Sequence, residues 1–228
     1  MKDIQSQEDS RCIDIRKVGV KNISYPISVL DKARQVQRTV ATVNMYVNLP
    51  HQFKGTHMSR FVEILNRHHC GFTLKSMHLV LQEMKDRLNA QAAHLEMNFP
   101  YYFQASRSPF SFKSQRYDCL VHSTLRQKME MVVRVKVPVA FCLPGSMTKE
   151  MLEGRWGTAL VSVRLHHFVW LEELIELIEH SLLPDDTVER LCRKISDCLK
   201  KRQAFSWYKV VVEHVSKGYQ TSAAIEGP

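Results

Sequence analysis

One order of predicted elements occurs twice along this 228-residue chain, and this repeat limits the possible folds more than any other feature. In each half, an alternating strand precedes two consecutive amphipathic helices, and further strands follow. In the first half the strand covers residues 39–49, where Val43, Met45 and Val47 alternate with polar residues. In the second half it covers residues 129–141. Two successive helices between strands argue against a doubly wound parallel sheet, in which single helices connect the strands.

Four stretches carry apolar residues at helical spacing, which predicts four amphipathic helices. Their apolar stripes are Met58, Phe61, Val62 and Leu65; Leu74, Met77, Leu81, Met84 and Leu88; Leu171, Leu174, Ile175 and Ile178; and Val188, Leu191, Cys192, Ile195 and Leu199. Further strands are expected at 93–103, 117–125, 159–165, 207–215 and 219–225. The pattern predicts an α+β fold with two modules, residues 1–112 and 113–228, each with a helix pair on one face of an antiparallel sheet. The other face would need cover, which a barrel-forming oligomer would supply.

Composition excludes several classes of protein. The formal net charge is +9, but the basic residues are dispersed, and the densest run, residues 200–202, closes a predicted helix, so we expect no nucleic-acid partner. The chain has no apolar run of about 18 residues and its first residues are polar, so we expect a cytoplasmic protein without a membrane partner. Six cysteines without C-x-x-C spacing indicate reduced thiols, with Cys192 acting as a small hydrophobic side chain.

Segments spread over almost the whole chain carry a family resemblance. The most specific is residues 54–61, which read KGTHMSRF. The others are the opening segment 3–26, FPYYF at 99–103, SPFS at 108–111, FVWLEELIE at 168–176 and WY at 207–208. Through these motifs the chain resembles the GTP cyclohydrolase IB family. The resemblance implies the tunnelling fold, with two modules per subunit, and a homo-oligomer that we expect to be a tetramer.

The resemblance also implies a reaction in which the imidazole ring of GTP is opened, formate is released and dihydroneopterin triphosphate forms. A metal-activated water would attack the purine, because metal binding lowers the pKa of water toward neutrality. The resemblance places the metal ligands on a Cys-Pro-Cys-Ser stretch, a following His and a C-terminal Glu-x-x-His. In this chain Gly145 stands at the position of the ligand Cys, residues 152–156 lack the His, and Ser216 and Tyr219 stand for the Glu and His. The family's charged insertion between the third and fourth helices is absent as well.

These departures lead us to expect no cofactor and no tightly bound divalent metal, because glycine has no ligating side chain and serine and tyrosine are poor zinc ligands. Substitute donors lie nearby in the sequence: they are Cys142, Glu153, Glu213 and His214. The candidates for a catalytic role are Glu213, His57 and Cys142. A buried thiol at a strand end is the competing interpretation of Cys142. We interpret His166 and His167 as surface histidines in a turn.

Six residues are expected to bind the ligand: they are Thr56, His57, Ser59, Arg60, Ser108 and Ser111. Residues 56–60 lie at a predicted helix start, where free backbone N–H groups and the helix dipole favour a phosphate. Ser108 and Ser111 are expected to serve a neighbouring subunit's site. Helix capping with surface charge, and turn formation around Pro109, are the competing structural interpretations.

Three functions remain open from the sequence. The main hypothesis is a GTP cyclohydrolase-like protein that binds or acts on a purine- or pterin-like heterocycle by metal-independent chemistry. One alternative is a non-catalytic subunit that assembles with an active paralogue. The other is a true GTP cyclohydrolase with a rearranged metal site. Because a fold alone does not decide the chemistry, the choice depends on the site.

Overall fold

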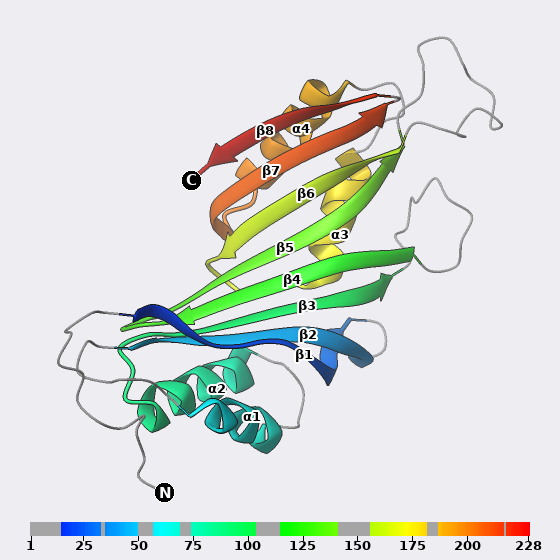
Figure 1. The fold of residues 1–228 in the computed structure, drawn as a ribbon. Coiled ribbons are helices and arrows are strands. Elements are labelled where there is room, and N and C mark those ends of the chain that lie inside the picture. Colours follow the sequence, from blue (N-terminus) through cyan, green and yellow to red (C-terminus); the bar gives the residue numbers. More distant parts are fainter. Residues whose placement is uncertain are drawn as a thin grey trace, which may run out of the picture. The chain divides into compact units, whose positions relative to one another are not determined.

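The computed structural model describes residues 15–32, 35–49, 57–68, 74–103, 115–140, 156–181, 187–216 and 218–228 (Figure 1). Within these ranges the elements are β1 (Ile15–Asp31), β2 (Gln35–Leu49), α1 (Met58–Arg67), α2 (Leu74–Arg87), β3 (Ala93–Phe103), β4 (Gln115–Leu125), β5 (Met129–Ala140), β6 (Trp156–Leu165), α3 (Leu171–Ser181), α4 (Val188–Lys200), β7 (Phe205–Ser216) and β8 (Tyr219–Gly227). The strands form an eight-stranded sheet in which each strand is hydrogen-bonded to its neighbours in sequence. The predicted α+β class, with two helix pairs and an antiparallel sheet, is confirmed.

The chain divides into two compact units, neither of which is one continuous segment. Unit 1 comprises residues 1–99 and 120–131, and unit 2 comprises residues 100–119 and 132–228. Strands β3, β4 and β5 therefore contribute residues to both units. The predicted module boundary at residues 112–113 lies outside the described residues.

In unit 1 the predicted alternation of β2 is confirmed, because Val43, Met45 and Val47 are fully buried. The strand before it, β1, was not among the strands predicted from the sequence, and it contains a register shift between Val20 and Ile23. At this bulge Asn22 has a φ of 59°, which asparagine tolerates better than most residues, and its N–H donates to Asn44 Oδ1 at 2.9 Å. The bulge thus depends on a side chain from the neighbouring strand.

The predicted stripe of helix α1 is confirmed for Phe61 and Leu65 but not for Met58 and Val62. Phe61, Ile64 and Leu65 are buried, whereas Met58 and Val62 are 40% and 43% exposed. The prediction for Met58 and Val62 was therefore wrong, because the buried stripe runs through Ile64, and positions 58 and 62 lie on its flank. In α2 the predicted stripe is confirmed for its described side chains, which are Met77, Leu81, Met84 and Leu88.

In unit 2, helix α4 covers β7 and β8. All five predicted stripe residues of α4 are buried, including Cys192, whose thiol lies 3.6 Å from the carbonyl oxygens of Val210 and Ala223. Burial raises the pKa of this thiol, which fits its predicted role as a small apolar side chain. Ser196 Oγ donates to the hydroxyl of Tyr208 at 3.0 Å and ties the helix to β7.

Helix α3 of unit 2 contacts its strands through buried polar side chains. Tyr101 on β3 donates to Glu172 Oε1 at 2.7 Å, and Tyr117 on β4 donates to Glu179 Oε1 at 3.1 Å. Glu172 and Glu179 are seven residues apart, which is two helical turns, so both carboxylates lie on the same side of α3. Burial and the carboxylate of Glu179 raise the pKa of Tyr117, which keeps this phenol a hydrogen-bond donor.

Candidate functional site

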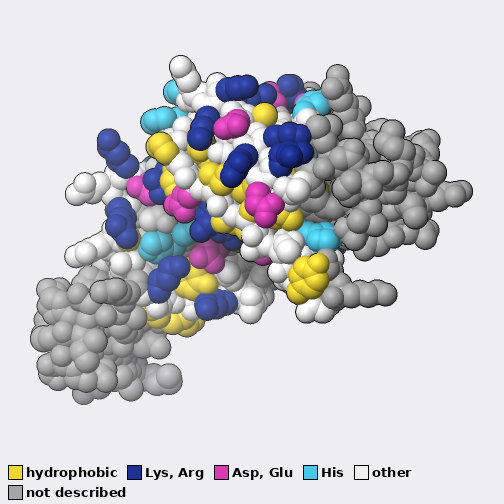
Figure 2. Space-filling view, turned by 90° about the horizontal axis from the view of Figure 1, so that it is seen from above, with side chains coloured by type: hydrophobic (Ala, Val, Ile, Leu, Met, Phe, Trp, Pro, Cys, Tyr) yellow, Lys and Arg dark blue, Asp and Glu magenta, His cyan; other side chains and the backbone are white. Residues whose placement is uncertain are grey.

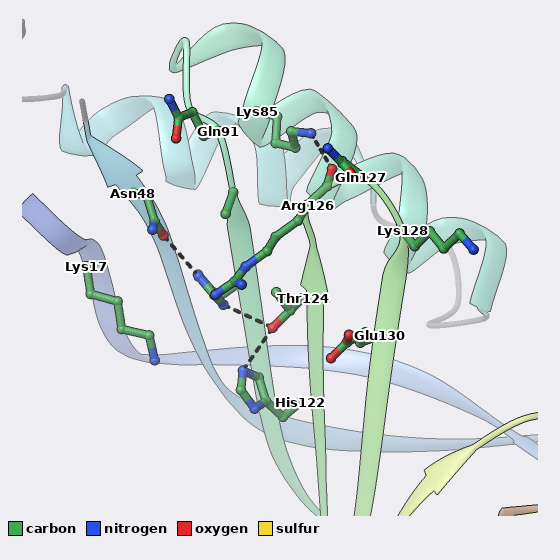
Figure 3. A pocket seen from close by; sticks show the side chains of 12 residues that line it. Lys17, Asn48, Lys85, Gln91, His122, Thr124, Arg126, Gln127, Lys128 and Glu130 are labelled. Carbon is green, nitrogen blue, oxygen red and sulfur yellow. Dashed lines mark hydrogen bonds between the residues drawn. The ribbon is translucent and has the colours of Figure 1, made fainter. Parts of the chain in front are cut away.

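An open pocket of about 1080 Å³ lies in unit 1, beside the C-terminal end of α2 and the turn between β4 and β5 (Figure 3). Strands β1 to β5 and α2 all contribute side chains to its lining. Asn48, His94 and Thr124 come from three successive strands. In a strand, neighbouring side chains point to opposite faces, so His94 and Thr124 lie on the face opposite to the buried Leu95 and Ser123.

A chain of hydrogen bonds crosses this pocket. The ring of His94 lies with Nε2 3.1 Å from Asn48 Oδ1 and Nδ1 3.0 Å from Thr124 Oγ1, and His122 Nε2 lies 3.4 Å from Thr124 Oγ1 (Figure 3). A carbonyl oxygen only accepts, so His94 donates from Nε2 to Asn48. In a neutral imidazole Nδ1 then accepts from the Thr124 hydroxyl, and Thr124 accepts from His122. With a neutral His94 the chain of donors therefore has a single direction.

The electrostatics agree with a neutral His94. Burial, followed by the positive charges of Lys17, His122 and Arg126, lowers the pKa of His94 to about 4. Glu96 opposes this effect only in part. At neutral pH the imidazole therefore carries no charge.

Cationic side chains are the most frequent charged groups around the pocket. Lys17, Lys85, Arg126 and Lys128 line it, against the single carboxylate of Glu130. Lys85 Nζ donates to the backbone carbonyl of Arg126 at 2.6 Å and so fixes the turn that carries Arg126. In Figure 3 the Arg126 side chain extends over the pocket toward Asn48 and Thr124, while Lys128 points away.

Lys17 is held in place by β2 and β3. Its ammonium lies 3.5 Å from Glu96 Oε1 and 4.6 Å from the centre of the Tyr46 ring, an arrangement typical of a cation–π contact. Asn44 Nδ2 donates to Glu96 Oε2 at 3.1 Å. Burial alone would raise the pKa of Glu96, but the Asn44 hydrogen bond and the charges of Lys17 and His122 lower it below its usual value. The Glu96 carboxylate is therefore ionised and orients Lys17.

The helix start expected to bind phosphate is described only in part. His57 is the N-cap of α1 and makes no side-chain capping bond, and Ser59 is exposed. Arg60 donates from Nη1 to the carbonyl of Arg87 at 3.1 Å, which links α1 to the end of α2. A guanidinium has five N–H donors, so this bond occupies only part of its capacity. The phosphate role of residues 57–60 stays a prediction, and Thr56 lies outside the described residues.

The C-terminal candidates do not form a common site. Glu213 and His214 are adjacent on β7, so their side chains point to opposite faces of the sheet. His214 is buried, and Glu213 is half-buried. Tyr219 begins β8 and is 65% exposed. Glu213 and His214 therefore cannot hold one metal ion together in this strand.

Several predicted site residues fall on segments that the structure does not describe. These are Cys142, Gly145 and Glu153, the serines Ser108 and Ser111, and the side chain of Ser216. Among the residues that are described, no three His, Cys, Asp or Glu side chains lie close enough to hold a metal ion. Because residues 141–155 are not included, the expected lack of a metal stays a prediction. His166 and His167 are exposed at a bend, as predicted.

Comparison with known proteins identifies the family. A family model described as type I GTP cyclohydrolase folE2 matches residues 1–185. A Pelobacter propionicus protein named GTP cyclohydrolase FolE2 is 41% identical over 230 residues, which cover 99% of this chain and 88% of that protein. The chain belongs to the GTP cyclohydrolase FolE2 family. A Geobacter sulfurreducens protein of the same name is 42% identical over 252 residues, covering 98% of this chain and 96% of that protein. The family name that these matches carry is type I and FolE2, not IB.

Solved structures support the fold independently of sequence. A hyperthermostable urate oxidase mutant from Bacillus sp. TB-90 aligns with a TM-score of 0.61 at 8% identity, over 94% of this chain and 99% of that one. The uricase of Arthrobacter globiformis aligns with a TM-score of 0.54 at 8% identity, over 92% of both chains. At such low identity the likeness concerns the fold alone. It agrees with the predicted tunnelling fold.

Sequence reasoning missed the pocket of unit 1. The signal was present in the alternation, since His94, Glu96 and Asn98 were the polar side of a predicted strand. A strand with polar residues at every second position normally has one face in water. The sequence of a single strand therefore does not show that Asn48, His94 and Thr124 lie close together. Their meeting depends on the register in which Tyr46 pairs with His94.

No helix in the described part of the chain is long and apolar enough to cross a membrane.

Proposed function

We propose that this chain is a GTP cyclohydrolase that opens the imidazole ring of GTP and yields dihydroneopterin triphosphate and formate. The observation that carries the proposal is the 41% and 42% identity to two curated FolE2 proteins over nearly the whole chain. This support favours a true cyclohydrolase over a divergent protein with other chemistry. Assembly into a homotetramer is part of the same proposal.

Substrate binding would use the start of α1. The family motif at residues 54–61 is present in full, and α1 begins inside it at Met58. The first N–H groups of a helix have no partner within the helix, and together with the dipole they favour a phosphate. The position of Ser59 and Arg60 in the first turn supports a role in holding the phosphates of GTP.

The described residues by themselves do not fit a divalent metal. Glu213 and His214 lie on opposite faces, and Tyr219 is a poor ligand at an exposed position. A metal-dependent reaction in this chain would therefore need donors from residues 141–155, where Cys142 and Glu153 are the candidates. A divalent metal held there would supply a water with a pKa near neutrality.

A second function is favoured by the residues that replace the family's ligands. By the family resemblance, Gly145, Ser216 and Tyr219 stand where the family has a thiolate, a carboxylate and an imidazole. This loss favours a protein that binds a purine- or pterin-like heterocycle without metal chemistry, or a non-catalytic subunit that assembles with an active paralogue. The two functions differ in turnover, so one assay distinguishes them.

The test is conversion of GTP, measured by the fluorescence of the oxidised neopterin product. Protein purified without chelator is incubated with GTP and with zinc, manganese or iron(II), beside the Geobacter sulfurreducens relative as a positive control. We expect metal-dependent product that chelator abolishes and that Cys142→Ala reduces at least about tenfold, since a metal-site ligand commonly contributes that much. Cys198→Ala, a thiol on α4, should leave the rate unchanged. No product in any metal, with an active control, would replace this proposal with the second function. Sedimentation velocity of the same sample checks the tetramer.

A further inference from the structure

The pocket of unit 1 holds several donor groups that the rest of the chain leaves unused. Within the described residues, the guanidinium of Arg126 has no hydrogen-bond or ion-pair partner. The ammonium of Lys128 has none either, but its side chain points away from the pocket. The amides of Gln91 and Gln127 also line the pocket without a described partner. Asn48 accepts from His94 through Oδ1, which leaves its N–H₂ group available. Donors that remain free in one concave site indicate a ligand that accepts hydrogen bonds.

The charges around the pocket point to an anion. Four cationic side chains line it against one carboxylate, Glu130. The Lys17 ammonium lies 3.5 Å from Glu96 Oε1. An ammonium has three N–H groups, and this contact occupies at most one of them. His94 is neutral and lies between Asn48 and Thr124, so it adds no competing charge. Of these four cations, Lys17 and Arg126 are the ones that act on His94, and they approach the pocket from β1 and from the β4–β5 turn.

The lining also limits the kind of anion. Among the twelve described residues around the pocket there is no Phe, Tyr or Trp, and the aromatic rings there are the imidazoles of His94 and His122. Guanidinium and ammonium groups match the oxygens of phosphate, and the planar Arg fork binds two of them at once. Lys17 lies on β1 and Arg126 lies in the turn between β4 and β5, and two cations on separate segments suit a chain of phosphates better than a single one.

We propose that this pocket binds a polyphosphate anion, held chiefly by Lys17 and Arg126 and assisted by the amide of Asn48. The phosphates are either the triphosphate group of a nucleotide or a free polyphosphate, and the chemistry of recognition is the same for both. The site is distinct from the α1 start and does not depend on cyclohydrolase activity. Apart from Lys17, its lining lies outside the motifs that carry the family resemblance.

The state of His94 supports this proposal. Burial is the main cause of the lowering of its pKa to about 4, and the positive charges of Lys17, His122 and Arg126 add to it. By linkage, an anion that neutralises these charges raises the pKa of His94. The hydrogen-bond chain from His122 to Asn48 would then hold the floor of the pocket in place while the cations contact the ligand.

The experiment is calorimetric titration of the full-length protein with sodium tripolyphosphate, in the absence of added metal, at fixed pH and moderate salt. The variants are Lys17→Met and Arg126→Met, separately and together, with Arg126→Lys to restore the charge. Lys136→Met is the matched control, because Lys136 is an exposed lysine on β5 that does not line the pocket. Circular dichroism verifies that each variant is folded.

We expect each pocket substitution to weaken tripolyphosphate binding by about tenfold, the effect of losing one charge-assisted hydrogen bond. Arg126→Lys should recover part of the affinity, and Lys136→Met should bind like the wild type. Competition by GTP but not by guanosine assigns the site to a nucleotide triphosphate. Binding of tripolyphosphate without competition by GTP assigns it to free polyphosphate. No binding, or equal binding by the wild type and the double variant, overturns the proposal whatever the result of the neopterin assay.

Discussion

The two units of this chain place their buried polar side chains differently. In unit 2 they lie between α3 and the strands, where Tyr101 is paired with Glu172 and Tyr117 with Glu179. In unit 1 the helix pair meets the strands through apolar side chains, and the polar chain through His94 lies on the other face of the strands, in an open pocket. The buried tyrosine–carboxylate pairs of unit 2 stabilise a single packing of α3 on the strands. The hydrogen-bond network of unit 1 is open to water, and its surroundings keep donor groups that a ligand can use.

Surface ion pairs also contribute to the packing of the helices in unit 1. In unit 1 the helices α1 and α2 are linked by ion pairs at the surface, where Glu83 contacts Arg67 at 3.0 Å and His68 at 2.8 Å. Exposed pairs of this kind contribute little to stability. Figure 2 shows lysine and arginine side chains spread over the visible face with acidic side chains between them. Unit 1 therefore owes its stability mainly to its apolar core, and we expect the polar groups of unit 2 to be the more sensitive to substitution.

The largest effect is expected for Tyr101→Phe. This change removes the donor to Glu172 and leaves a carboxylate buried against α3, at a cost of about 2 kcal/mol in the free energy of unfolding. Tyr102→Phe is the matched control, because Tyr102 is the next residue on β3 and is 49% exposed. It should change stability by less than about 0.5 kcal/mol. Urea unfolding at pH 7.5 measures both, and equal losses would mean that the Tyr101–Glu172 pair is no more important than a surface contact.

Most of the fold could be predicted because it depends on periodicity. The alternation of β2 and the stripes of α2 and α4 are set by which residues leave water, and these patterns are local. The exception is α1, where Ile64 is buried and Val62 is not. Both positions are apolar in a short helix, so the pattern alone permits either residue to face the core. The contact with β1 determines which of them is buried. Tyr25 on β1 donates to the carbonyl of Leu65 at 3.2 Å, a contact that no local pattern predicts.

The candidate site could be predicted less well, for a different physical reason. The helix start at residues 57–60 follows from local sequence, because free N–H groups exist wherever a helix begins. The pocket depends on residues up to about a hundred positions apart, such as Lys17 and Arg126, that meet only through strand register. The buried partners of Tyr101 and Tyr117 were missed for the same reason, since Glu172 and Glu179 read as surface positions of an amphipathic helix. The roles expected for Ser108, Cys142 and Gly145 stay predictions, because these residues lie in segments 104–114 and 141–155, outside the described residues.

A smaller effect is expected from pH in unit 1. The pKa of His94 is lowered to about 4 in the folded protein, against about 6.5 in the unfolded chain. The neutral imidazole therefore contributes stability above pH 6.5, and this contribution is lost as the pH falls toward 4. Between pH 7.5 and 5 the wild type should lose about 1 to 1.5 kcal/mol more than His94→Gln, allowing for screening at the open pocket. Identical pH dependence of the two proteins in urea unfolding would show that His94 titrates normally.

The smallest effect, with the opposite sign, is expected from Glu179 in unit 2. Burial raises the pKa of Glu179, and the hydrogen bond from Tyr117 opposes this shift only in part. The folded state therefore favours the protonated acid, so the contribution of Glu179 is present below the unfolded pKa of about 4.3 and is lost as the pH rises through the folded pKa. Glu179→Gln keeps an oxygen that can accept from Tyr117 but removes the titration.

On raising the pH from 4 to 7, Glu179→Gln should gain about 1 kcal/mol of stability relative to the wild type, since an ionised carboxylate is no longer buried. Glu176→Gln is the control, because Glu176 lies on the same helix and is partly exposed. It should follow the wild type at both pH values. If the two glutamine variants have the same pH dependence, the burial of Glu179 on α3 has no energetic consequence. The contrast between a closed polar layer in unit 2 and an open one in unit 1 would then have no support. If only Glu179→Gln shows the gain while His94→Gln shows the opposite slope, each unit responds to acid through its own polar layer.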